Sequence, residues 1–292
     1  MTRLTWVDRA GRPTGTVGPP GRYRNPVLSP DGTRVAVERT DPQSATQDIW
    51  LIELARGVAS RFTFDAHNDI YPVWSPDGSR IAFGSDRDGG VFSVYEKPTN
   101  GASSEVLLLK NAEGAVPYGW APDGQVLVYR IGNGTGLGLL PRAGTQKPQL
   151  FEQTPFPATY AQVSPTGRWI AYVSPESGRF EVYVQSFPTP GGKYQISKDG
   201  GIGPRWRSDG KELFFSSLDG QLTAVSVAGE TALDVGTAVP LFRAALLPSG
   251  GGRRQQYDVT RDGQRFLLNL VGDDTPTATI TVVVNGTAGL KP

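Results

Sequence analysis

Residues 71–83 read Tyr71-Pro72-Val73-Trp74, then Ser75-Pro76-Asp77-Gly78, then Ser79-Arg80-Ile81-Ala82-Phe83. One apolar segment enters the Ser-Pro-Asp-Gly turn and a second one leaves it. Asp and Gly stand where a tight hairpin needs a side-chain acceptor and a residue that tolerates a positive φ. The stretch therefore predicts a β-hairpin.

The same hairpin recurs along the whole chain, and its third turn positions are 46, 46, 43, 43 and 53 residues apart. A period of roughly 40–50 residues with strand content is typical of a β-propeller that has one four-stranded blade per repeat. We therefore predict a single all-β domain over residues 1–292, a closed propeller of six blades, with seven blades as the alternative. The hairpins lie near residues 27–37, 73–83, 119–129, 162–172, 205–215 and 257–268, and the turn positions held by Asp are Asp31, Asp77, Asp123, Asp209 and Asp262, with Thr166 in the fourth copy.

The number of candidate third strands predicts how the ring closes. A third strand follows each hairpin, and the last of these is Ile280–Val284. The chain also begins with a segment of the same kind, Leu4–Asp8, which makes seven such strands for six hairpins. Because an open array leaves unpaired edges, we expect the N-terminal segment to complete the last blade beside Thr279–Asn285. The surplus strand is the reason for keeping seven blades as the alternative.

Composition limits the classes of function. The chain of 292 residues has 29 Lys plus Arg against 28 Asp plus Glu, so no overall basic field favours nucleic acid or an anionic membrane. It has no Cys and one His, which removes the commonest ligands of zinc, copper and iron. No apolar stretch approaches the roughly 18 residues that span a bilayer, and the N-terminus lacks the apolar core of a signal peptide. We expect no cofactor or metal, no membrane insertion by this segment and a monomer, cytoplasmic as written or extracytoplasmic if cut from a membrane-anchored parent.

With the repeat established, the chain resembles the TolB-like, WD-repeat-like propeller family. It is most similar to the propellers that follow the kinase domain in bacterial serine/threonine protein kinases, especially acidobacterial ones. The resemblance covers essentially the whole chain and implies a propeller fold. It is carried by Pro72–Gly78, Gly167–Tyr172, Glu176–Val184, Gly203–Trp206 and the tail Ile280–Asn285.

The resemblance does not extend to kinase activity, because no kinase glycine loop, His-Arg-Asp or Asp-Phe-Gly motif is present. His67 lies in a polar loop, and there is no Gly-x-Ser-x-Gly motif to supply a nucleophile. The turn aspartates are interpreted as structural turn residues, spread around the circumference, and not as metal ligands. We therefore predict that the chain is not an enzyme and name no catalytic residue.

Binding residues are expected on the rim opposite the repeated turns, where the segments that enter each hairpin differ between copies. Variable loops on a rigid ring commonly carry binding specificity, and Tyr and Arg are frequent at binding hot spots. A Tyr at such a position can equally cap the core with its hydroxyl in water. The candidates for binding a ligand or partner are Tyr23, Arg24, Asp69, Tyr71, Tyr118, Tyr160, Arg205, Arg254 and Tyr257.

The prediction of function is a non-catalytic recognition or sensor module that binds a protein, a peptide or a small polar ligand. It resembles the sensor propeller of a receptor-like kinase. The alternative is a propeller enzyme of the lactonase, lyase or glycosidase type with its active site at the channel mouth, which needs converging acids, amides or histidines. The propeller of a prolyl-oligopeptidase-type peptidase is a third option, and it needs an attached hydrolase domain.

Overall fold

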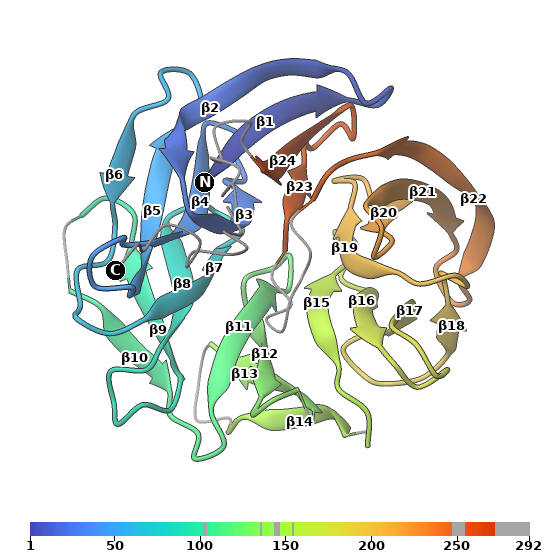
Figure 1. Ribbon diagram of the computed structural model, residues 1–292. Coiled ribbons are helices and arrows are strands. Elements are labelled where there is room, and N and C mark those ends of the chain that lie inside the picture. The colour runs from blue at the N-terminus through green and yellow to red at the C-terminus, as the bar shows by residue number, and fades with distance from the viewer. Residues whose placement is uncertain (102–103, 135, 143–146, 154, 247–254, 272–292) are drawn as a thin grey trace, which may run out of the picture.

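The computed structural model describes residues 1–101, 104–134, 136–142, 147–153, 155–246 and 255–271. They form a six-bladed propeller of four-stranded antiparallel sheets (Figure 1). No helix occurs in these ranges. The all-β class and the six blades are therefore confirmed.

Five blades use four consecutive strands, and each begins with the hairpin expected from the repeat. Blade 1 consists of β3 (Tyr23–Leu28), β4 (Arg34–Thr40), β5 (Gln47–Glu53) and β6 (Ala59–Arg61). Blade 2 consists of β7 (Asp69–Trp74), β8 (Arg80–Ser85), β9 (Ser93–Pro98) and β10 (Val106–Leu109). Blade 3 consists of β11 (Ala115–Trp120), β12 (Val126–Ile131), β13 (Gly136–Pro141) and β14 (Gln149–Gln153). Blade 4 consists of β15 (Thr159–Val163), β16 (Trp169–Ser174), β17 (Glu181–Ser186) and β18 (Lys193–Gln195). Blade 5 consists of β19 (Ile202–Trp206), β20 (Glu212–Ser216), β21 (Gln221–Ala228) and β22 (Asp234–Arg243).

Blade 6 closes the ring with strands from both ends of the chain. Its order is β2 (Pro13–Gly21), β1 (Thr2–Asp8), β24 (Arg265–Val271) and β23 (Tyr257–Val259). All seven residues of β1 pair with β24, from Thr2 with Val271 to Asp8 with Arg265. The expected closure by N- and C-terminal strands is confirmed, with one correction. We expected β1 beside Thr279–Asn285, but it pairs directly with β24 and so occupies the third position itself. The proposed strand Ile280–Val284 lies outside the described residues.

The core consists of apolar clusters between neighbouring blades. Trp74 packs with Ile49 and Ala36 of blade 1, and Trp206 packs with Val182 and Val184 of blade 4. The indole nitrogens of these tryptophans also cross between blades, Trp74 Nε1 donating to the carbonyl of Val27 at 3.0 Å and Trp206 Nε1 to that of Gln162 at 3.1 Å. The recurring tryptophans therefore hold adjacent blades together, as their placement before the turn indicated.

Each repeated turn is a self-contained hydrogen-bonded unit. In the second copy the Asp77 carboxylate accepts from Ser75 Oγ at 2.5 Å and from the amide of Ser79 at 3.0 Å. The fourth residue is a glycine with φ of 68 to 71° in all six copies, a conformation that glycine adopts at low cost. The interpretation of the turn aspartates as turn formers agrees with these contacts.

The Asp77 turn makes stability depend on acid. The Ser75 hydroxyl, followed by the Ser79 amide, lowers the pKa of Asp77 from 3.8 to about 2. A carboxyl with a lowered pKa stabilises the fold above its unfolded pKa and loses that contribution as pH falls through the folded value. We expect Asp77→Asn to cost less than about 1 kcal/mol at pH 5, because the site is exposed, and nothing near pH 2. Urea unfolding from pH 5 to pH 2 measures this.

The control for that experiment is Asn133→Ala, which changes an exposed loop residue without a titrating group. Its stability curve should run parallel to that of the original protein at every pH. If the Asp77→Asn curve were also parallel, the turn carboxylate would have no linked contribution.

In the part of the chain that the structure describes, no helix has the length and apolar character needed to cross a membrane.

Candidate functional site

A cavity of about 950 Å³ lies at the centre of the ring. The inner strand of every blade contributes to its wall: β3, β7, β11, β15, β19 and β23. The second position of all six repeated turns also lines it, at Pro30, Pro76, Pro122, Pro165, Ser208 and Arg261. The cavity is therefore the propeller's central channel, and it reaches the face that carries the turns.

The turns gather around this channel instead of lying far apart on the circumference, which corrects our expectation of their spacing. A Cβ on Gly78 would lie 3.6 Å from Pro30, and one on Gly167 would lie 3.4 Å from Pro122. Where the proline is replaced, hydrogen bonds connect the turns. Ser208 Oγ donates to the carbonyl of Arg261 at 2.7 Å, and Arg261 Nη1 donates to the carbonyl of Pro30 at 2.9 Å. The mouth of the channel is thus a ring of touching turns.

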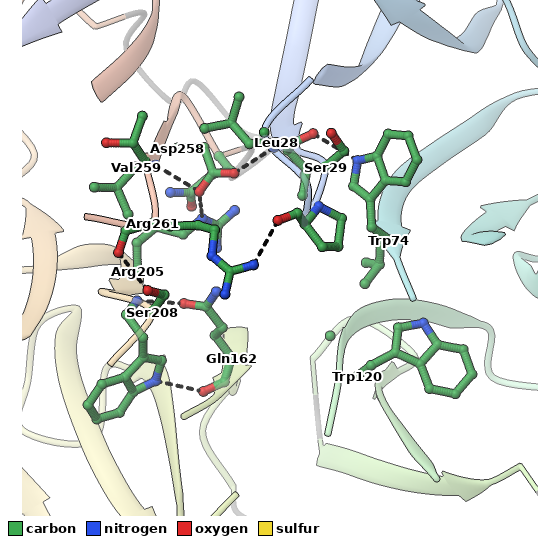
Figure 2. A pocket seen from close by; sticks show the side chains of 18 of the residues that line it. Leu28, Ser29, Trp74, Trp120, Gln162, Arg205, Ser208, Asp258, Val259 and Arg261 are labelled. Carbon is green, nitrogen blue, oxygen red and sulfur yellow. Dashed lines mark hydrogen bonds and ion pairs between the residues drawn. The ribbon is translucent and has the colours of Figure 1, made fainter. Parts of the chain in front are cut away.

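The middle of the channel has two chemically different halves. The residue two positions before each turn lines the cavity in all six blades. In blades 1 to 3 this residue is Val27, Val73 or Gly119, and in blades 4 to 6 it is Gln162, Arg205 or Asp258. Figure 2 shows Gln162, Arg205 and Asp258 on one side of the cavity and Trp74 and Trp120 on the other. The channel wall is therefore apolar on one side and polar on the other.

Arg205 and Asp258 form the centre of the polar half. Arg205 Nε lies 3.1 Å from Asp258 Oδ1, and their side chains are 12% and 11% exposed. Asp258 also accepts from the amide of Leu28 at 2.7 Å and from that of Val259 at 2.9 Å. Burial raises the pKa of Asp258, and the positive charge of Arg205 opposes that rise. The carboxylate is therefore held by a guanidinium and two amides and joins blades 5, 6 and 1.

The end of the channel away from the repeated turns, called its inner end below, is built on bulges in the innermost strands of the blades. Asn25, Tyr71 and Tyr160 have φ of 47, 55 and 57°, and each lies four residues before its turn. Glycine occupies the same position in blade 5, where Gly203 has φ of 62°. Such a conformation costs on the order of 1–3 kcal/mol for a bulky residue such as Tyr, and strained residues of this kind are often found at functional sites. The bulges present Asn25, Tyr71 and Tyr160 to the cavity.

Glu38, from the second strand of blade 1, supports two of these bulges. Its carboxylate is fully buried and accepts from Asn25 Nδ2 and, at 2.7 Å, from the backbone amide of Tyr71. Gln255 completes the inner end by accepting at its carbonyl from the amide of Asn25 at 3.0 Å and donating its own amide to Asn25 Oδ1 at 2.6 Å. Buried polar groups thus hold the strained inner end in place.

Two tyrosines and an arginine form an aromatic corner beside the bulges. The rings of Tyr71 and Tyr118 meet edge to face with centroids 5.8 Å apart. The Arg130 guanidinium lies 5.8 Å from the Tyr71 ring centroid. Burial raises the pKa of the Tyr118 phenol more than the positive charge of Arg130 acts to lower it, so Tyr118 stays neutral and can donate or accept a hydrogen bond.

The structure separates the nine residues proposed for binding. Tyr71, Tyr118, Tyr160 and Arg205 line the channel. Tyr23, Asp69 and Tyr257 are almost fully buried elsewhere and have structural contacts: Tyr23 Oη donates to the carbonyl of Pro19, Arg87 pairs with Asp69, and Tyr257 Oη donates to the carbonyl of Gly203. Arg24 is exposed and does not line the cavity, and Arg254 lies outside the described residues.

Sequence reasoning passed over three residues that shape the channel, namely Glu38, Gln255 and Arg261. Glu38 lies on the second strand of its blade, and Gln255 lies in the segment before β23, from which Arg254 and Tyr257 were selected instead. Arg261 replaces the proline of the repeated turn, and that departure was a visible signal. His67 lies outside the cavity lining and pairs with Asp65 at 2.7 Å.

Comparison with known proteins agrees with this architecture. Residues 11–140 match the family model of the TolB beta propeller domain. The first half of the chain is thus similar to the TolB beta propeller domain. A TolB candidate protein from Agrobacterium tumefaciens has the same fold with a TM-score of 0.72 and 18% identity, over 92% of this chain and 97% of that one. TolB from Acinetobacter baumannii aligns with a TM-score of 0.63 and 15% identity, over 83% of this chain and 64% of that one. At these identities the likeness shows the fold alone.

Two curated relatives match this chain over less than half of its length. An uncharacterized peptidase, YuxL of Bacillus subtilis, is 31% identical over 132 residues, which are 42% of this chain and 19% of that protein. Tricorn protease homolog 1 of Streptomyces coelicolor is 34% identical over 84 residues, which are 29% of this chain and 8% of that protein. The matched segment is thus a small part of both relatives.

Proposed function

We propose that this TolB-like propeller is a non-catalytic recognition module that receives a segment of a partner protein or peptide in its central channel. The observation that carries the proposal is the cavity of about 950 Å³, whose wall combines aromatic and aliphatic side chains with a few polar groups. Binding pockets typically have volumes of about 300–1,000 Å³ and this mixture of chemistry. The proposal places the contact in the channel, where four of the nine proposed binding residues lie. A sensor role in a kinase-linked protein belongs to the same proposal and rests on the sequence resemblance.

The state of the channel's carboxylates favours binding over catalysis. In the described part of the chain, the acidic residues in the cavity lining are Asp258 and Asp262. The Asp258 carboxylate pairs with Arg205 and accepts hydrogen bonds from two backbone amides. The Asp262 carboxylate accepts hydrogen bonds from the Thr260 hydroxyl and the amide of Gln264 in its own turn. A general base needs a carboxylate that can reach a substrate proton. These two are tied into the structure.

A second candidate function follows from the curated relatives, which are named as peptidase and protease. Because the match covers so little of either relative, the propeller would serve as one part of a larger peptidase and select its substrate segments. This role again depends on the channel. A lactonase, lyase or glycosidase acting at the channel mouth is less well supported, because the cavity's acids are already engaged.

Filling the channel tests the proposal. A Cβ on Gly119 would lie 3.7 Å from the nearest atom, the carbonyl oxygen of Ala161, so Gly119→Ala should be tolerated. Gly119→Met adds a flexible chain at a position that lines the cavity. Linear peptides that bind the original protein are first selected from a displayed random library. We expect their affinity for the Gly119→Met variant to be about 100-fold lower, a loss of about 2.7 kcal/mol in binding free energy. Titration calorimetry measures the loss.

The matched control is Gly119→Ala, which should stay within about 3-fold of the original affinity, since it adds one methyl group at ordinary contact distance. Peptides that bind Gly119→Met as well as the original protein would place the binding surface outside the channel. Failure of the library to yield any binder would count against a peptide or protein partner.

A further inference from the structure

On the polar side of the channel, the oxygens of Asp258 and the amide oxygen of Gln162 already accept hydrogen bonds within the protein. Both oxygens of Asp258 accept hydrogen bonds from the protein, and one also pairs with Arg205. Gln162 Oε1 accepts from the amide of Trp206 at 2.9 Å. That bond also fixes the orientation of the Gln162 amide, since an amide nitrogen at the same place would oppose the Trp206 N–H. The side-chain acceptors of Asp258 and Gln162 are therefore committed to the fold.

Three residues on this side keep donors that have no acceptor among the described residues. Within the described part of the chain, Gln162 Nε2 has no acceptor. Arg205 uses Nε for Asp258 and Nη1 for the carbonyl of its neighbour Pro204 at 3.3 Å, which leaves Nη2. Arg261 uses Nη1 for the carbonyl of Pro30 and leaves its other terminal nitrogen. Figure 2 shows Arg261 extending across the cavity from the side of Gln162 and Arg205.

The charge balance of the lining agrees with this donor excess. Among the described residues, the charged side chains that line the cavity are those of three arginines, Arg205, Arg261 and Arg265, and two aspartates, Asp258 and Asp262, a balance of +1. Since both aspartates accept hydrogen bonds from the protein, the charged groups left to face a ligand are guanidinium donors. Carboxylates are the acceptors that a planar arginine fork and an amide N–H₂ group hold best.

The opposite half of the channel offers an apolar wall. Val27 of blade 1 and Val73 of blade 2 line the cavity. Figure 2 shows Trp74 and Trp120 across the cavity from Gln162, Arg205 and Asp258. Trp120 Nε1 has no hydrogen-bond partner among the described residues, whereas the equivalent nitrogens of Trp74 and Trp206 each have one. A ligand that crosses the channel therefore meets donors on one side and indole and valine surfaces on the other.

We propose that the channel binds an amphipathic carboxylate, whose carboxylate group is held by Gln162, Arg205 and Arg261 and whose apolar group packs against Trp74 and Val73. The inference deepens the proposed function and rests on the channel being the binding site. The same chemistry is found in a free aryl or branched alkyl acid and in the C-terminal residue of a peptide with a large apolar side chain.

The test compares acids with their amides. Indole-3-propionate and indole-3-propionamide form the small-molecule arm, and an acetylated Gly-Gly-Trp tripeptide with a free or amidated C-terminus forms the peptide arm. We expect the acid of at least one arm to bind with a Kd on the order of 1 mM and its amide at least 10-fold more weakly. Titrations that follow the tryptophan indole signals by ¹H–¹⁵N NMR measure both. The arm whose acid binds identifies the source of the carboxylate.

Gln162→Glu isolates the polar half. A glutamate keeps the acceptor for the Trp206 amide but turns an available donor into a negative oxygen, so acid binding should fall by about 10- to 100-fold. Gln149→Glu, an exposed residue on β14, adds the same charge outside the channel and should leave binding unchanged. Arg261→Met, at the exposed turn, provides a second variant in case Gln162→Glu does not fold, and it too should weaken acid binding.

The outcomes separate this inference from the proposed function. Equal binding of acid and amide, or full acid binding by Gln162→Glu or Arg261→Met, would overturn the carboxylate site. The carboxylate site is also overturned if neither acid binds while the selected peptides still bind and respond to Gly119→Met, and the proposed function then stands. Acid binding in the small-molecule arm, together with a library that yields no peptide, would support the carboxylate site and remove the peptide partner.

Discussion

Replacing Asp258 with alanine is expected to lower the free energy of unfolding by about 3–5 kcal/mol, the cost of breaking a buried ion pair by removing one partner. The substitution leaves the Arg205 guanidinium charged and buried and takes the acceptor from the amides of Leu28 and Val259. Because this one carboxylate connects three blades at the point where the ring closes, its loss also weakens closure by blade 6. Urea unfolding followed by tryptophan fluorescence measures the change.

A double substitution separates two contributions to the loss of stability, the unpaired charge of Arg205 and the lost hydrogen bonds of the two amides. In Arg205→Met with Asp258→Leu neither charge is present, so the double variant should be more stable than Asp258→Ala by about 1–2 kcal/mol. Asp262→Ala is the control, since Asp262 accepts bonds only within its exposed turn and should cost about 1 kcal/mol or less. Asp258→Ala within about 1 kcal/mol of the original protein would show that the carboxylate does not tie the blades together.

The second large effect is expected at Glu38, where replacement by alanine should cost about 2–4 kcal/mol. The carboxylate is fully buried, and its removal leaves the side-chain amide of Asn25 and the backbone amide of Tyr71 without their hydrogen-bond acceptor. Both of those residues hold a positive φ, so the strain that Glu38 offsets is then uncompensated. Peptides that bind in the channel should lose affinity together with the stability, since the inner end is no longer held.

Glu53→Ala provides a matched comparison in the same blade. The Glu53 side chain is 42% exposed and pairs with Arg56 three residues later. Exposed pairs of this kind contribute roughly 0–1 kcal/mol, so little change is expected. If Glu38→Ala and Glu53→Ala had equal stabilities by thermal and urea unfolding, the buried carboxylate would not support the bulges.

Much of the fold could be predicted because it is encoded locally. The Ser-Pro-Asp-Gly turn needs only its own residues: Asp77 accepts from Ser75 and Ser79, and Gly78 takes the positive φ. Apolar segments on either side of each turn then form the first two strands of every blade. A fixed repeat of such units leads to a ring, because each blade can bury its faces only against similar neighbours.

The sequence predicted that strands from both ends of the chain close the ring, but it did not predict which strand pairs with the N-terminal one. Leu4–Asp8 and Ile280–Val284 both read as third strands, and no local rule ranks them. In the structure β1 pairs with β24 over its whole length. The choice depends on contacts between residues at opposite ends of the chain, which short-range patterns do not contain.

The candidate site was only partly predictable for a related reason. Tyr71, Tyr118, Tyr160 and Arg205 were selected as residues of a rim, and the structure places them in the channel wall. The bulges at Asn25, Tyr71 and Tyr160 turn the side chains of those three residues toward the channel. A bulge changes which side chains of a strand face the channel. Strict alternation along a strand cannot anticipate that shift.

The sequence alone determined the repeating hairpin, its turn chemistry and the absence of cysteine, because these follow from residues that are neighbours in the chain or from composition. It favoured six blades over seven, and the structure decided for six. Only the tertiary structure decided that six turns meet around one channel, that Gln162, Arg205 and Asp258 share a wall opposite Val27, Val73 and Gly119, and that Glu38 supports the bulges. Each of those residues lies on a different blade or strand, and their common chemistry exists only once the ring has closed and brought them within contact distance.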